Sequence, residues 1–174
     1  GIKYGQLYCL NPDTGAIIGN TSVIANQGWV GLSSTAAVTE DTVWINSLQP
    51  ETRLYGYSLD LKEEKYNISL PNATGSMYSS PSLSVDETVI YVPSNGGVEA
   101  YSTSTGEKLW VADFGLTYAN KYQPSTPVYS NNVLYFTDGK SQLFAVNAET
   151  GEKIWNVSCK VAGKSTPAVT DSKI

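Results

Sequence analysis

The chain has 174 residues, a net charge of −5 at pH 7 and a single arginine, Arg53. So acidic a chain lacks the basic surface that nucleic acids require, and no segment approaches the roughly 18 uninterrupted apolar residues of a membrane span. It contains no histidine, which removes the commonest general base and the usual zinc ligand.

In chain order, the same series of segments recurs about every 45 residues. Residues 1–32 hold LYCLNPDTG (7–15), and the next stretch holds LYGYSLDLKEEKY (54–66). TGEKLW at 105–110 then returns as TGEKIW at 150–155. Repetition at periods of about 20–50 residues is typical of solenoids, propellers and arrays.

A second landmark divides the chain into units. It reads STAAV (34–38), SSPSL (79–83), STPVY (125–129) and STPAV (165–169). Three units are complete: 33–78, 79–123 and 124–164. Residues 1–32 supply only the third and fourth segments of a unit, and residues 165–174 supply only the first and the start of the second.

Each complete unit predicts four short antiparallel strands. In the last one they are 125–130, 133–138, 141–147 and 152–158, and Asn131-Asn132 supplies a tight turn. Gly15, Gly106 and Gly151 stand in the last turn of their units, where positive φ is easy for glycine. Stacking such sheets around an axis hides their faces and edges. The prediction is an all-β propeller of about four repeats, three complete and one split between the termini.

The motif A-x-D-x-x-T-G-x-x-x-W in these units resembles that of PQQ-like (quinoprotein-type) β-propellers, along the whole chain. The copies Ala145–Trp155 and Ala100–Trp110 depart from it only at Asn147 and Ser102. The first copy has Cys9 and Gly19 in the Ala and Trp positions. The second has Lys62 for Gly and Tyr66 for Trp. The resemblance implies that Trp110, Trp155 and Tyr66 dock each blade on its neighbour, and we expect both tryptophans to be largely buried.

The resemblance leaves two functions open. One is a non-enzymatic scaffold or binding surface for a protein or glycan, like the tandem-repeat cell-surface relatives that this chain resembles most. The other is a portion of a PQQ- and Ca²⁺-dependent oxidoreductase. Such enzymes resemble one another in a vicinal cysteine pair, but Cys9 and Cys159 are far apart here. We therefore expect no enzyme activity, no catalytic residue, no metal and no cofactor.

Propeller loops suggest where a ligand would bind. The segments that enter the innermost strands carry aromatic and amide side chains, which suit sugars and peptides. These candidates are Trp29, Tyr78, Tyr118, Asn120 and Tyr122. The alternative is that the same aromatics plug the channel or pack between blades.

Four N-x-[ST] sequons are candidate glycosylation sites: Asn20, Asn67, Asn72 and Asn156. With 12 asparagines and 36 serines or threonines in 174 residues, about 2.5 sequons are expected by chance, so four is a mild excess. Together with the acidic composition and the resemblance, they favour an extracellular or cell-surface location. The chain begins at Gly1 without a signal peptide, so we expect a processed product or a portion of a longer protein.

Three closures of the ring are open. The terminal fragments could pair within one chain in a four-bladed ring. They could pair between two copies in an eight-bladed ring, or with further blades of a longer parent chain. The second and third are favoured over the first, because a four-bladed ring needs sharp wedging between sheets. A disulfide between Cys9 and Cys159 would need the first and last units to touch.

Overall fold

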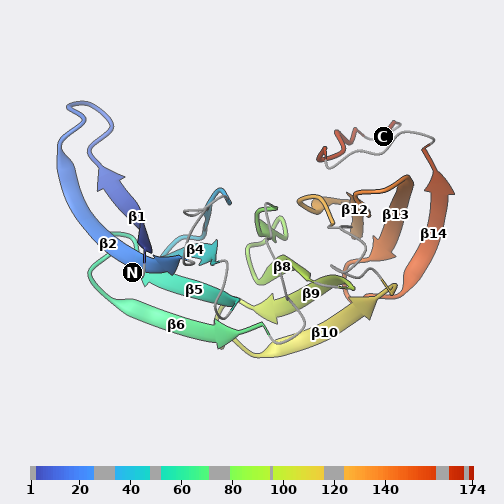
Figure 1. The fold of residues 1–174 in the computed structure, drawn as a ribbon, viewed down its shortest axis with the longest axis horizontal. Coiled ribbons are helices and arrows are strands. Elements are labelled where there is room, and N and C mark those ends of the chain that lie inside the picture. Colours follow the sequence, from blue (N-terminus) through green and yellow to red (C-terminus); the bar gives the residue numbers. More distant parts are fainter. Residues whose placement is uncertain are drawn as a thin grey trace.

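A computed structural model shows four antiparallel sheets arranged side by side in an open arc (Figure 1). The structure describes residues 3–25, 34–47, 52–70, 79–94, 96–115, 124–159, 165–170 and 173–174. The first and last sheets lie at opposite ends of the arc. The predicted all-β propeller fold is confirmed, and none of the described residues forms a helix that could span a membrane.

The sheets follow one another in chain order. The first has two strands and the other three have four each. The first holds β1 (Lys3–Leu10) and β2 (Ile17–Ala25); the second holds β3 (Ala37–Val38), β4 (Thr42–Asn46), β5 (Arg53–Ser58) and β6 (Glu64–Ser69); the third holds β7 (Ser82–Leu83), β8 (Val89–Ser94), β9 (Gly97–Ser102) and β10 (Lys108–Asp113); the fourth holds β11 (Val128–Ser130), β12 (Val133–Thr137), β13 (Gln142–Asn147) and β14 (Lys153–Ser158).

The turns form at the positions predicted from the sequence. Asn131 and Asn132 have φ of 49° and 62°, so they join β11 to β12 in the tight turn that hairpins prefer. Gly15, Gly106 and Gly151 have φ of 70°, 72° and 74°. In the last of these turns Asn147 Oδ1 accepts hydrogen bonds from the amides of Glu149 and Thr150. The motif's polar residue therefore closes the turn that its glycine permits.

The apolar core lies between sheets, with one cluster at each of the three junctions. The junction of the third and fourth sheets joins Tyr91, Val98 and Ala100 to Leu134 and Phe136. Separate clusters fill the junction of the second and third sheets and that of the first and second. Each sheet is thus held by its neighbours rather than by a common centre.

A small residue in the third strand of each complete sheet lies between two aromatic rings. Gly56 pairs with Trp44 and Tyr66, Ala100 with Tyr91 and Trp110, and Ala145 with Tyr135 and Trp155. The ring centroids are 4.8, 5.9 and 6.0 Å apart in these three pairs. A larger residue between the rings would push them apart, which explains the alanine or glycine at this position of the repeat.

In the second and third sheets the outer ring of the pair packs on the glycine turn of the following sheet. A Cβ on Gly106 would lie 3.0 Å from the Tyr66 ring, and one on Gly151 would lie 2.6 Å from the Trp110 ring. Tyr66 also donates a hydrogen bond to the carbonyl of Ser104, at 2.9 Å, and Trp110 donates one to that of Ala148, at 3.2 Å. We call this contact of ring and turn the aromatic clamp.

At the junction of the first and second sheets the small and the bulky residues are exchanged. Gly19 occupies the position of the outer ring, and a Cβ there would lie 1.9 Å from the Asp60 carbonyl oxygen. The neighbouring turn has no glycine; instead Leu61 adopts φ of 60° and is buried in the cluster of this junction. A bulky turn thus sits against a bare backbone, and the burial of Leu61 offsets its backbone strain.

Hydroxyl groups connect the sheets near the axis of the arc. The amide of Thr35 donates to Ser80 Oγ at 2.7 Å, and the amide of Ser80 donates to Thr126 Oγ1 at 2.9 Å. All three residues are the second residue of the Ser/Thr landmark. The first three copies of the landmark are therefore joined in series by the same hydrogen bond, and we call this series the hydroxyl ladder.

Both tryptophans are less buried than expected: Trp110 is partly buried against the core of its junction, and Trp155 is more exposed. It is 36% exposed, and its ring lies beside Tyr135 of its own sheet. The reason is that the described part of the chain places no glycine turn after it. Residues 165–170 and 173–174 hold no strand, although 165–174 is expected to start another blade. In the described residues the first and last sheets do not pair with each other.

We predict that Trp110→Ala lowers the free energy of unfolding by about 3–5 kcal/mol, the usual range for a large aromatic in a core. Trp155→Ala should cost about 1 kcal/mol, because its ring has only one side covered. Denaturant unfolding of both variants measures the difference. Equal losses would contradict the clamp.

Gly151 and Gly15 provide a matched pair, since both have φ near 70° but only Gly151 faces a ring. Gly15→Ala should cost about 1–2 kcal/mol from backbone strain alone. Gly151→Ala should cost more by a further 1–3 kcal/mol or so, because the new methyl group overlaps Trp110. The same unfolding assay tests this, and an equal cost at the two positions would show that the Trp110 contact is unimportant.

Candidate functional site

The loop-face residues named from the sequence lie outside the described residues. They are Trp29, Tyr78, Tyr118, Asn120 and Tyr122. Their proposed role in binding stays a prediction. The described residues form a different candidate binding surface.

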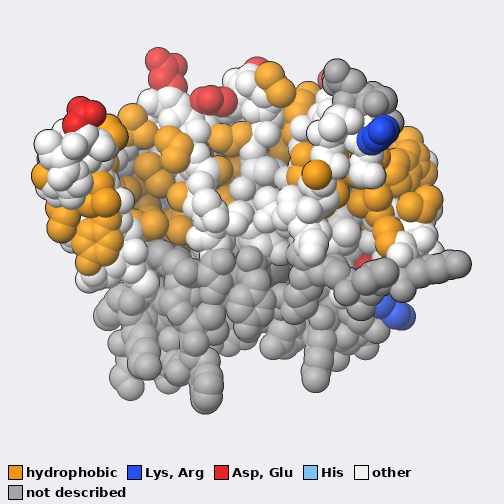
Figure 2. All heavy atoms as spheres, turned by 90° about the horizontal axis from the view of Figure 1, so that it is seen from above, with side chains coloured by type: hydrophobic (Ala, Val, Ile, Leu, Met, Phe, Trp, Pro, Cys, Tyr) orange, Lys and Arg blue, Asp and Glu red, His pale blue; other side chains and the backbone are white. Residues whose placement is uncertain are grey.

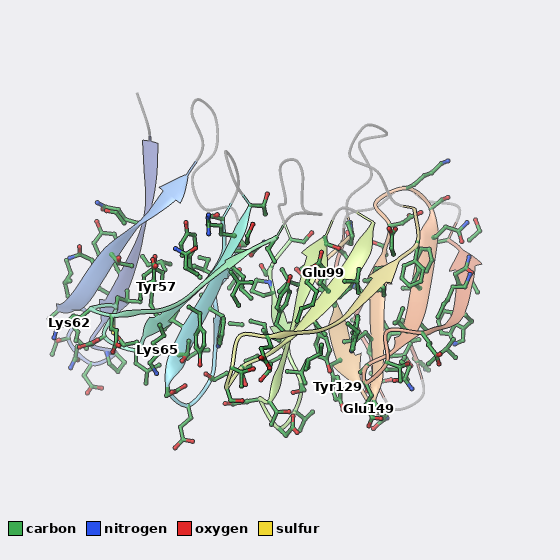
Figure 3. The ribbon with its side chains drawn as sticks, turned by 90° about the horizontal axis from the view of Figure 1, so that it is seen from below. Tyr57, Lys62, Lys65, Glu99, Tyr129 and Glu149 are labelled. Atoms are coloured by element: carbon green, nitrogen blue, oxygen red, sulfur yellow. The ribbon has the colours of Figure 1, made fainter. Side chains whose placement is uncertain are left out.

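That surface is a groove of about 390 Å³ between the first and second sheets. Its lining is apolar and carries no charged side chain. The lining residues are Leu7, Tyr8, Cys9, Ala36, Val38, Val43, Leu59 and Leu61. Its floor is the core cluster of this junction, which includes Tyr57 (labelled in Figure 3). Figure 2 shows hydrophobic side chains gathered at this end of the arc, and Tyr8 is 52% exposed.

The groove lies beside an open strand edge. β1 pairs with β2 on one side, and among the described residues no strand pairs with its other side. In the three complete sheets this position is taken by the second strand, which brings Trp44, Tyr91 or Tyr135 over the small residue. In the first sheet the small residue is Cys9, and the corresponding space is the groove.

Such an edge can accept an extended segment. Its free backbone amides and carbonyls form the ladder of hydrogen bonds, and the groove receives alternate side chains of the added strand. The sequence predicted the missing strands, but it gave no sign that the gap would be an apolar hollow. That hollow exists because Leu59 and Leu61 of the unusual turn contribute to its wall.

The third sheet contains a buried charged group that was not predicted from the sequence. Glu99 is fully buried, accepts a hydrogen bond from the Tyr101 hydroxyl at 2.5 Å and forms an ion pair with Lys108 at 2.6 Å (labelled in Figure 3). Among the residues that the structure describes, no hydrogen-bond partner lies at its Oε1 atom. The signal was available, because the equivalent residues Tyr8, Tyr55 and Phe144 are all aromatic.

Glu99 affects the pKa of the neighbouring Tyr101. Burial first, and then the hydrogen bond to Glu99 and its charge, raise the pKa of the Tyr101 phenol well above its ordinary value. Burial raises the pKa of Tyr57 and Tyr91 too. The Tyr101 phenol therefore stays neutral at neutral pH, and its hydrogen bond to Glu99 helps to stabilise the junction.

Acidic side chains line a second hollow of about 350 Å³, including Glu40, Asp41, Asp86 and Glu87. In the described part of the chain, no group of three or more histidine, cysteine, aspartate or glutamate residues could hold a metal ion. The NPDTG segment (11–15) is a turn in which Asn11 Oδ1 accepts hydrogen bonds from the amides of Asp13 and Thr14.

Other predicted residues are placed as follows. Asn20, Asn67 and Asn156 are exposed on outermost strands, whereas Asn72 lies outside the described residues. Cys9 and Cys159 are free thiols, one in the groove and one exposed after β14.

The raised pKa of Tyr101 predicts a loss of stability at alkaline pH. The folded state keeps the phenol neutral, so its contribution is complete below pH 10, the unfolded pKa, and falls as pH rises above it. Unfolding free energies at pH 9 and pH 11 should therefore differ less for Tyr101→Phe than for the unaltered chain. An identical pH dependence would contradict this.

Comparison with known proteins places the chain among propellers. The family model described as outer membrane protein assembly factor BamB matches residues 3–173. BamB from Moraxella catarrhalis has a similar structure, with a TM-score of 0.65 and 17% identity over 88% of this chain and 46% of that one. A europium-containing methanol dehydrogenase is similar with a TM-score of 0.54 and 15% identity, over 71% of this chain and 24% of that one.

A further relative is the tetrathionate hydrolase of Acidithiobacillus ferrooxidans. It is 40% identical over 60 residues, which are 34% of this chain and 11% of the hydrolase. The chain thus spans less than half the length of each of these proteins. Because the family model covers nearly every residue, the chain belongs to the PQQ-like β-propeller repeat family described as outer membrane protein assembly factor BamB.

Proposed function

We propose that this chain is a non-enzymatic propeller module that acts outside the cytoplasm as a scaffold and binds an extended segment of a partner protein. The observation that carries the proposal is the apolar groove beside the open edge of β1. Main-chain hydrogen bonds along such an edge supply affinity for any extended segment, and the groove selects apolar or aromatic side chains at alternate positions.

The chemistry of the groove supports binding rather than catalysis. Its described lining residues include no carboxylate, histidine or cation, and the thiol among them, Cys9, has no histidine to act with because the sequence contains none. The family is described by an assembly factor for outer membrane proteins, which supports a protein as the partner. The dehydrogenase neighbours share the fold at 15–16% identity, and fold alone does not carry an activity.

A labelled peptide with the sequence of residues 132–138, NVLYFTD, tests the groove, because this segment supplies a second strand in the fourth sheet. We expect saturable binding with a Kd on the order of 10–100 µM by fluorescence anisotropy. Cys9→Trp should abolish binding because the indole fills the groove. Cys159→Trp, at an exposed position elsewhere, should leave it unchanged.

Two results would contradict the proposal. One is equal binding by the unaltered chain and Cys9→Trp, with both shown to be folded by circular dichroism. The other is a bound quinone absorption band after incubation with PQQ and Ca²⁺, which would favour the oxidoreductase alternative.

A further inference from the structure

Three sequons occupy the same position in three different sheets. Asn20 pairs with Tyr8, Asn67 with Tyr55 and Asn156 with Phe144. Each of these partners directly precedes the small residue of its third strand. The three asparagines therefore lie at one height on the outermost strands β2, β6 and β14, at the periphery of the arc (Figure 1).

The side chains that an enzyme must reach are exposed. Residues two apart on a strand share a face, so each asparagine lies beside the serine that completes its sequon. All six side chains are exposed: Asn20 with Ser22, Asn67 with Ser69, and Asn156 with Ser158. Adjacent residues point to opposite faces, so Asn156 points away from the face on which Trp155 lies beside Tyr135.

The polar contacts of these asparagines are of the kind that water or sugar can replace. Asn156 Nδ2 donates to Gln142 Oε1 at 2.9 Å, and Asn67 Nδ2 donates to Glu64 Oε1 at 2.9 Å. Both contacts are exposed, and exposed polar pairs contribute little to stability. Modification of either nitrogen leaves the clamp, the ladder and the groove intact.

We infer that Asn20, Asn67 and Asn156 carry N-linked oligosaccharides that form a sugar-bearing outer rim. The inference rests on the location outside the cytoplasm given under the proposed function. In the transfer, Nδ2 forms a bond to the anomeric carbon of an oligosaccharide held on a lipid phosphate or pyrophosphate. The bond from that carbon to the phosphate oxygen breaks, its electrons leave with the lipid phosphate, and one Nδ2 proton passes to a base of the transferase.

Oligosaccharides at these positions would protect the outer strands from pairing with other chains. Outermost strands are sheet edges, and exposed edges with apolar side chains tend to pair with other chains. β2 contains no charged residue, and Ile17 and Ile18 on it are 61% and 49% exposed. β14 exposes Ile154 and Val157. An oligosaccharide in the middle of each edge blocks approach of another strand there.

The third sheet provides a built-in comparison. Val111 of β10 pairs with Glu99, so it holds the same position as the three asparagines, and it is 42% exposed. Its strand carries no sequon. The double substitution Val111→Asn with Asp113→Ser creates one at an equivalent place without touching the existing three.

Peptide mass spectrometry of the protein, purified from the cells that produce it, tests the inference. We expect a sugar mass on peptides that contain Asn20, Asn67 and Asn156, and none on Asn46, which lies outside any sequon. Ser158→Ala should remove the sugar from Asn156 although Asn156 and Gln142 are retained. The double substitution at 111 and 113 should add one further oligosaccharide.

Cell fractionation in the same experiment separates the two proposals. A protein that is outside the cytoplasm but unmodified at all three asparagines overturns the glycan rim and leaves the proposed function standing. A protein confined to the cytoplasm overturns both. Sugar that persists in Ser158→Ala at Asn156 overturns the assignment to sequon-dependent transfer.

Discussion

The close approach of two aromatic rings over a small residue is the constraint on which the structure depends. Gly56 and Ala100 leave room for the pairs Trp44–Tyr66 and Tyr91–Trp110. Each pair then presents one ring to the glycine turn of the next sheet. A glycine turn with positive φ has no side chain between its backbone and the ring, so the ring can contact that backbone directly. The small residue, the ring and the glycine therefore form one packing contact that spans two sheets. This explains why these three positions recur together in the sequence.

Much of the fold could be predicted from the sequence because its signals are local. Turn residues such as Asn131-Asn132 and Gly151 act within a few residues, and strand periodicity follows from alternation along the chain. The packing at the junction of the first two sheets was harder to predict, because Gly19 and Lys62 looked like unrelated losses of motif residues. The structure shows that they belong together: the loss of a ring on one sheet is matched by Leu61 on the other.

The candidate site was the least predictable part. The groove depends on which side chains of two sheets meet across a gap, and neither sheet contains that information alone. Buried Glu99 was overlooked because its meaning depends on Tyr101 and Lys108, which follow it along the chain and converge only in the fold. The groove and the exposed asparagines come from different strands. The groove lies beside the inner edge of β1, whereas the asparagines lie on the outermost strands.

The reversed junction at Gly19 has a consequence for curvature. Near the axis, the hydroxyl ladder holds consecutive landmarks at one hydrogen-bond length, as between Thr35 and Ser80. At the periphery, the separation of sheets depends on what lies between them, a whole indole at Trp110 but only backbone at Gly19. A thicker filling at the periphery opens the wedge between two sheets and a thinner one narrows it, so the angle at each junction depends on the outer-strand residue together with the turn that it meets, as Gly19 meets the turn of Leu61. The angle between neighbouring sheets, which sets how many sheets a full turn requires, is therefore governed by side chains at the periphery rather than by the length of the repeat.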